Sequence, residues 1–411
     1  MYIYYFFYLL IEHKKIVINN FQIKPIFQTN FPAKGEKMQK SSIIGKSIEE
    51  IDTPALLIDL DIMEKNIHTM ADFYTGKKGA ALRPHQKGHR LPLVAKTQMD
   101  TGACGVSITT LGLAEYYVTC GIDSILLTNE IAGKNKMRRV CTLSKLADIT
   151  VGVDNLENAR HFGVIAGEQN TIIQVGVELY MGTGTCGVEI EEALPFIKEL
   201  VSMENIQFNG LWWHQGSLAD ILDWEERKQA HFTTLDRVSR LKDSLEDAGI
   251  DVTMISGGFT CTWDITPLHP TLKQVEVQAG SYVFSDWCSH ESEGLEAFDY
   301  ALTVLSRCIS RPKSDEALLD AGMNACTDEH TDSYRNIVGF KVKGMENITR
   351  VKQREELSMI QSEDTIDLRV GDTVELLPPH ADTTAKLHDT YYCVRKGVVE
   401  AIWPNHGRGL L

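Results

Sequence analysis

The sequence has no Cys-x-x-Cys pair, no internal repeat, no low-complexity tract and no apolar run long enough to span a membrane. Its nine cysteines are scattered and odd in number, so they indicate neither a disulfide framework nor a thiolate zinc site. Basic residues are also scarce, since 41 of them stand against 56 acidic ones and the formal net charge is −15. We therefore expect a cytoplasmic protein with no nucleic-acid partner and no membrane partner.

The chain opens with a continuous apolar run from Met1 to Ile11. This run is too short for a transmembrane helix, and it lacks the basic region and the small-residue cleavage site of a secretory signal. We interpret residues 1–37 as an N-terminal extension and expect natural translation to begin at Met38. An anchor on a membrane surface is the alternative.

Apolar, β-branched runs recur at regular spacing between residues 79 and 284, and the stretches between them show helical periodicity. The runs are 79–84, 105–109, 124–129, 149–154, 171–178, 208–214, 252–257 and 276–284. Eight strands separated by helices predict an α/β fold, the (β/α)8 TIM barrel, whose functional site lies at the C-terminal ends of the strands.

The rest of the chain predicts a second domain, because 411 residues are too many for one ordinary core. Short β-rich runs follow residue 290, at 300–305, 337–342, 373–377 and 398–402, and an earlier strand at 55–60 would be a ninth in the barrel. We therefore predict a barrel over 61–290 and a C-terminal β domain made of 38–60 plus 291–411. No long linker separates them, so they should pack rigidly.

Lys87 is the leading catalytic candidate, because it directly follows the first predicted strand and should face the barrel mouth. Its basic neighbours Arg83, His85, His89 and Arg90 are expected to lower its pKa toward the neutral amine that Schiff-base chemistry needs. The alternative is a basic loop that binds any anion.

Glycine and hydroxyl residues accompany the last two predicted strands, the usual phosphate-binding place of this barrel. They are Ser256, Gly257 and Gly258, which close the seventh strand, and Gly280, Ser281 and Tyr282, which lie within the eighth. Glycines that merely turn the chain are the alternative. A lysine opposite a phosphate cradle favours pyridoxal 5′-phosphate (PLP) as cofactor, with His85 beside the lysine.

Two further features carry possible chemistry. His214 follows the sixth strand, so it should face the barrel mouth and contact the cofactor or transfer a proton, unless it is a structural core histidine. His380 and Asp382 would lie on one side of an extended segment, and imidazole with carboxylate suits Mn²⁺ or Mg²⁺, with Zn²⁺ as an alternative. An ordinary surface pair is the other interpretation.

In this order, the motifs resemble the D-threonine aldolase and D-serine dehydratase-like family, fold type III PLP enzymes of the alanine-racemase type. The resemblance covers about residue 50 to the end and rests on Asp52–Asp61, the Arg-Pro-His-x-Lys run at 83–87, Gly257-Gly258, Ala279–Phe284 and His380-Ala-Asp382. It implies that Lys87 holds PLP, that His380 and Asp382 bind a divalent metal, and that the protein is a homodimer.

The resemblance implies a lyase that cleaves a β-hydroxy-D-amino acid, by default D-threonine, to glycine and an aldehyde. A D-serine or 3-hydroxy-D-aspartate dehydratase is the alternative, although relatives of that kind tend to have cysteine where this chain has Asp382. A PLP carrier without turnover is a different class, and the predicted β domain counts against it. Thr185 departs from the family, which typically has arginine there, and threonine cannot replace that fixed charge.

Overall fold

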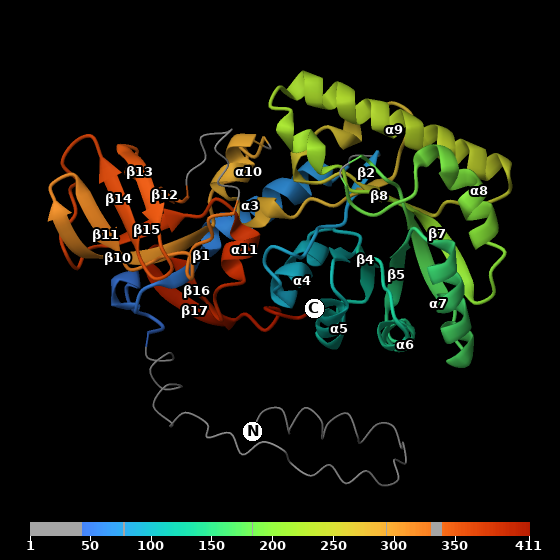
Figure 1. The fold of residues 1–411 in the computed structure, drawn as a ribbon, viewed down its shortest axis with the longest axis horizontal. Coiled ribbons are helices and arrows are strands. Elements are labelled where there is room, and N and C mark those ends of the chain that lie inside the picture. The colour runs from blue at the N-terminus through green and yellow to red at the C-terminus, as the bar shows by residue number, and fades with distance from the viewer. Residues whose placement is uncertain (1–42, 77–78, 183, 293, 330–338) are drawn as a thin grey trace, which may run out of the picture. The chain divides into compact units, whose positions relative to one another are not determined.

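Two sheets organise residues 43–76, 79–182, 184–292, 294–329 and 339–411, which are the residues that the computed structural model describes (Figure 1). The predicted extension 1–37 lies outside these ranges. No helix within them is long and apolar enough to cross a membrane.

The eight-stranded sheet is parallel, with the order β2-β9-β8-β7-β6-β5-β4-β3. Its strands are β2 (Ala80–Leu82), β3 (Val106–Ile108), β4 (Ser124–Leu127), β5 (Asp148–Val153), β6 (Ile173–Glu178), β7 (Ile206–Trp212), β8 (Met254–Gly257) and β9 (Val275–Val277). Backbone hydrogen bonds from Cys104 N to Leu82 O (2.9 Å) and from Ser107 N to Pro84 O (3.1 Å) close the sheet between β2 and β3. Each strand overlaps one predicted run, so the TIM barrel is confirmed.

Helices surround the barrel strands, as Figure 1 shows. They are α4 (Pro92–Asp100), α5 (Leu111–Thr119), α6 (Lys134–Leu143), α7 (Leu156–Glu168), α8 (Ile190–Leu200) and α9 (Trp224–Asp247). Local sequence explains where two of them begin, because the side chains of Asn155 and Asp223 accept hydrogen bonds from the first turns of α7 and α9. In α8, Ala193, Ile197 and Leu200 follow helical spacing and are fully buried against the barrel.

The last predicted strand was too long. β9 ends at Val277, and residues Ser281–Val283 form a short 3-10 helix, η5. The backbone N–H groups of Gly280 and Ser281 donate to Thr260 Oγ1, both at 3.3 Å, instead of to a neighbouring strand. Gly280, Ser281 and Tyr282 therefore follow the eighth barrel strand and do not lie within it.

The nine-stranded sheet is built mainly from the C-terminal part of the chain. Its strand β1 (Ala55–Asp59) pairs antiparallel with β10 and parallel with β16, which confirms that this early strand lies outside the barrel. The other strands are β10 (Leu302–Lys313), β11 (Glu316–Leu319), β12 (Lys341–Val342), β13 (Ile348–Gln353), β14 (Ser358–Ser362), β15 (Thr373–Leu377), β16 (Thr390–Arg395) and β17 (Val398–Pro404). The sequence did not predict β11, β13, β14 and β16, and the exact domain limits stay a prediction.

Two helices connect the two sheets along the chain, α3 (Leu60–Tyr74) and α10 (Trp287–Ser292), and α11 (Ala381–Ala385) lies between β15 and β16. One apolar cluster includes Leu82 and Phe284 from the barrel side and Tyr391 from the C-terminal sheet. Across the same junction, Tyr391 donates a hydrogen bond to His89 O at 2.9 Å, and Ala381 N donates to Asp286 Oδ2 at 2.9 Å. These contacts hold α11 beside the loops of the barrel mouth.

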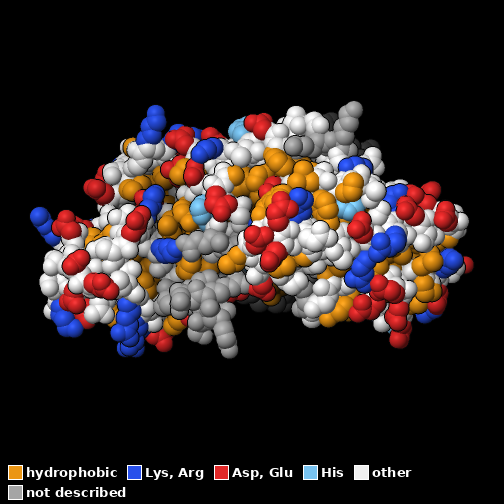
Figure 2. Space-filling model, turned by 90° about the horizontal axis from the view of Figure 1, so that it is seen from above, with side chains coloured by type: hydrophobic (Ala, Val, Ile, Leu, Met, Phe, Trp, Pro, Cys, Tyr) orange, Lys and Arg blue, Asp and Glu red, His pale blue; other side chains and the backbone are white. Residues whose placement is uncertain are grey.

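Surface charge contributes little to this positioning. On the face drawn in Figure 2, acidic and basic side chains are interspersed with hydrophobic ones. Exposed ion pairs such as Arg237–Glu191 (2.8 Å) are screened by water and add little to stability. The buried core, and not the surface, therefore fixes the geometry of the site.

Candidate active site

A cavity of about 670 Å³ lies at the C-terminal ends of the barrel strands. The loops after β2, β4, β6, β7, β8 and β9 contribute to its wall, and so does α11. Among the predicted site residues, those that line it are Lys87, His85, His214, Gly280, Ser281, His380 and Asp382. The fold thus gathers candidates from distant parts of the sequence around one space.

Lys87 has a different electrostatic environment from the one its sequence neighbours predict. Its Nζ lies 3.4 Å from Asp382 Oδ2, an opposite charge. Arg83 forms a two-pronged ion pair with Glu276, at 2.6 and 3.0 Å. The expected crowd of positive charges around Lys87 is therefore only partly present. Folding pairs Arg83 with a distant carboxylate and brings another carboxylate to the lysine, whereas Arg90 Nε still donates to Lys87 O at 3.2 Å.

The two histidines beside Lys87 are neutral. Burial, and then the charge of Lys87, lower the pKa of His85 to about 3, and burial lowers the pKa of His89 to about 4. His85 Nδ1 accepts a hydrogen bond from Lys87 N at 3.2 Å, so it fixes the loop that carries the lysine. At neutral pH neither ring therefore adds positive charge, and His85, which lines the cavity, can offer a polar contact to a ligand.

His380 and Asp382 lie together, although not on an extended segment as expected. His380 has an extended backbone and precedes α11, whereas Asp382 lies within that helix. His380 Nε2 is 3.7 Å from Asp382 Oδ2, and His380 Nδ1 is 3.2 Å from Glu329 Oε2. Burial opposes the ionisation of Asp382, but the charges of Lys87 and His380 outweigh it and lower its pKa to about 2. An imidazole nitrogen and an ionised carboxylate are thus directed to one point.

Glycines let the surrounding loops approach closely. A Cβ on Gly88 would lie 2.6 Å from Asp382 Oδ1, and one on Gly280 would lie 2.7 Å from His85 O. Gly258 has a φ of +73°, which suits glycine and turns the chain toward Thr260 at the cavity wall. The hydroxyl residues Thr260 and Ser281 therefore line the cavity next to the Lys87 loop.

Other predicted phosphate-site residues have packing contacts. Ser256 is fully buried and donates to Glu276 O at 3.2 Å, and a Cβ on Gly257 would lie 2.2 Å from Trp213. Tyr282 is also fully buried, and its hydroxyl accepts a hydrogen bond from Gln98 at 2.7 Å. None of these three, nor Gly258, is among the described cavity-lining residues.

His214 lines the cavity, next to the ring of Phe259 at a centroid distance of 5.0 Å. Burial, and then the charge of Lys87, lower the pKa of His214 to about 4. This histidine is therefore neutral at pH 7 and can accept a proton.

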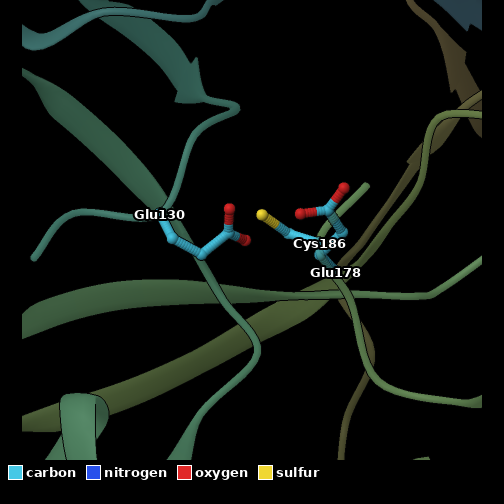
Figure 3. A group of neighbouring side chains, drawn as sticks. All are labelled: Glu130, Glu178 and Cys186. Atoms are coloured by element: carbon cyan, nitrogen blue, oxygen red, sulfur yellow. The ribbon is translucent and has the colours of Figure 1, made fainter. Parts of the chain in front are cut away.

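A carboxyl cluster on the cavity wall, made of Glu130, Glu178 and Cys186, was not predicted from the sequence. Glu130 follows β4, Glu178 ends β6 and Cys186 follows it, and their side chains point toward one another (Figure 3). Their side-chain oxygen and sulfur atoms lie within 4.8 Å of one another. Thr185 lines the cavity beside them. Glu130 and Cys186 lie in loops without local pattern, so only barrel closure reveals this group.

Comparison with known proteins shows which families and proteins this chain resembles. Residues 58–285 match the family of the alanine racemase N-terminal domain, and residues 301–394 match the putative serine dehydratase domain. The chain is 32% identical over 375 residues to 3-hydroxy-D-aspartate aldolase of Paracoccus denitrificans (strain Pd 1222), which covers 89% of this chain and 94% of that protein. It is 30% identical over 369 residues to D-threonine aldolase of Arthrobacter sp, covering 89% and 95%. The crystal structure of D-threonine aldolase from Filomicrobium marinum matches with a TM-score of 0.81 and 28% identity, over 90% of this chain and 98% of that one.

The barrel, its mouth cavity and the second sheet define a protein of the alanine-racemase type. Within that class, the chain belongs to the D-threonine aldolase and D-serine dehydratase-like family, so the resemblance seen in the sequence is confirmed. The aldolases that it resembles are lyases.

Proposed function

We propose that the protein is a PLP- and divalent-metal-dependent lyase that cleaves β-hydroxy-D-amino acids, in the manner of D-threonine aldolase, to glycine and an aldehyde. One observation carries this proposal: Lys87 Nζ and His380 Nε2 lie 3.4 and 3.7 Å from the same Asp382 oxygen in one cavity. The lysine that would bind the cofactor and the two residues that would bind the metal would therefore face the same substrate.

The residues around Lys87 fit PLP. The cavity volume of about 670 Å³ accommodates the cofactor and a small amino acid. Gly280 lets its loop touch the loop of Lys87, because a Cβ there would lie 2.7 Å from His85 O. Lys87 would bind the cofactor covalently, and the hydroxyls of Thr260 and Ser281 would hold its phosphate. Bound PLP supplies an electron sink for the bond that breaks.

The residues around Asp382 fit a divalent ion. Asp382 stays ionised because its pKa is about 2. Glu329 contacts His380 Nδ1 at 3.2 Å and so orients Nε2 toward Asp382, as carboxylates commonly do for metal-binding histidines. An ion held there supplies a Lewis acid for the substrate hydroxyl. His214 is neutral and lines the same cavity, so it can accept the proton that the hydroxyl loses.

A dehydratase is the second candidate, since residues 301–394 match the putative serine dehydratase domain. Product analysis in the presence of Mn²⁺ separates the two. Glycine and acetaldehyde from D-threonine indicate the aldolase, whereas pyruvate and ammonia from D-serine indicate the dehydratase. If neither set of products forms from either substrate, the proposed function is contradicted.

The role of Lys87 has its own test. Wild-type protein should show the absorbance of lysine-bound PLP at the boundary of the ultraviolet and visible ranges. Treatment with borohydride should attach the PLP to the protein irreversibly. Lys87→Ala should lose this covalent labelling, whereas Lys134→Ala, which changes an exposed lysine of α6, should keep it. Full labelling of Lys87→Ala would overturn the assignment.

A further inference from the structure

The carboxyl cluster, which contains Glu130 and Glu178, lies across the barrel from Lys87. Lys87 follows β2, and Glu178 ends β6. In the closed sheet, β6 is the fourth strand from β2 in both directions, either through β9, β8 and β7 or through β3, β4 and β5. Both residues line the same cavity. A ligand attached to Lys87 that extends across the barrel mouth would therefore meet the cluster.

Glu178 is rigidly placed, and one of its two carboxyl oxygens has no hydrogen-bond partner among the described residues. Its carbonyl accepts a hydrogen bond from Val188 N at 2.8 Å, and its backbone pairs with Trp212 of β7. The residue is only 4% exposed, yet among the described residues no donor bonds to Glu178 Oε2 or Glu130 Oε1. A buried acceptor of this kind is costly unless a ligand supplies the hydrogen bond.

The cluster holds a proton as well as a negative charge. Burial, then contact with Glu130, raise the pKa of Glu178 to about 10. The hydrogen bond from the Cys186 thiol to Glu130, and then burial, raise the pKa of Cys186 to about 12. Two carboxyl groups this close share one proton, so the pair carries a single negative charge at neutral pH.

No arginine is present among the described residues that line the cavity. Thr185, where the family resemblance implied arginine, brings no charge to this wall. An arginine there would neutralise the pair and repel a second cation. In its absence, the cluster is suited to a cationic N–H donor that belongs to a ligand.

The ring nitrogen of PLP is para to the carbon that bears the aldehyde, so attachment at Lys87 directs that nitrogen toward the opposite wall. We propose that Glu178, supported by Glu130, accepts a hydrogen bond from the ring nitrogen of PLP and keeps that nitrogen protonated. This inference rests on the proposed binding of PLP at Lys87. A protonated ring withdraws electrons more strongly, so Glu178 would strengthen the electron sink on which the proposed cleavage depends.

A cofactor analogue with C–H in place of the ring nitrogen tests the contact. The apo-protein is titrated with PLP and with this analogue, and the ratio of the two dissociation constants is compared between wild type and Glu178→Gln. Differences in aldehyde reactivity are common to both proteins and cancel in this comparison. The preference for PLP should fall by roughly tenfold or more in Glu178→Gln, the scale of a hydrogen bond to a charged group. Glu189→Gln, which changes an exposed carboxylate outside the cavity lining, should keep the wild-type preference.

A second measurement uses the wild-type holoenzyme, so it does not depend on whether the variant folds. Reconstituted with ¹⁵N-ring-labelled PLP, it should give the nitrogen signal of a protonated ring. A neutral-ring signal, or an unchanged preference in a folded Glu178→Gln protein, overturns the proposal. So does a Zn²⁺ or Mn²⁺ ion that binds this cluster in competition with PLP. If borohydride fixes no PLP to wild-type Lys87, the proposed function fails first and this inference with it.

Discussion

Replacing Gly88 by alanine should weaken metal binding without removing any proposed ligand. The new Cβ would lie 2.6 Å from Asp382 Oδ1, so the carboxylate must move by roughly 1 Å to regain contact distance. Asp382 has little freedom, since it is 3% exposed and a hydrogen bond from Ala381 N to Asp286 Oδ2 (2.9 Å) holds the start of its helix. We expect a loss of about 10- to 100-fold in affinity for Mn²⁺, and a stability cost of ~1–3 kcal/mol from overpacking.

The assay measures activity against Mn²⁺ concentration, together with thermal unfolding and borohydride fixation of PLP. Gly88→Ala should need more Mn²⁺ for half-maximal activity while Lys87 is still labelled. Gly167→Ala is the matched control. Gly167 lies in α7, outside the cavity lining, and its new Cβ would lie 2.7 Å from the Asn205 Nδ2 atom, so it would crowd a polar side chain as well. An unchanged Mn²⁺ dependence in Gly88→Ala would refute the assignment of Asp382 as a metal ligand.

Three further outcomes are expected. EDTA should abolish cleavage while the cofactor absorbance remains, and His380→Ala should lower the rate by about a hundredfold or more; an undiminished rate after chelation would contradict the metal site. Sedimentation should show a homodimer at assay concentration, and a fully active monomer would count against it. Stability should fall as the pH drops below 6.5, because His231 is buried with a pKa of about 3 and stays neutral in the folded chain, whereas unfolding lets it bind a proton. In His231→Gln, the slope of the free energy of unfolding against pH should be smaller by about 1.4 kcal/mol per pH unit, as measured by urea titrations. An unchanged slope would mean that His231 is protonated in both states.

Local pattern was enough to predict the barrel strands and the position of Lys87. Most of these strands are buried apolar runs separated by helices, and a lysine that follows such a run should lie at the barrel mouth. It was not enough for the second sheet, where β13 (Ile348–Gln353) mixes partly buried and exposed residues without alternation and lacks an apolar run. Its pairing with β14, and not its own composition, makes it a strand.

By itself, the sequence determined the barrel, the family and the candidates at the strand ends, because strand periodicity and short motifs are properties of neighbouring residues. Only the tertiary structure decided the charges around them. It paired Arg83 with Glu276, brought Asp382 to 3.4 Å from Lys87, and set Glu130 against Glu178. Electrostatic interactions depend on distance and burial in space, and neither can be inferred from separation along the chain.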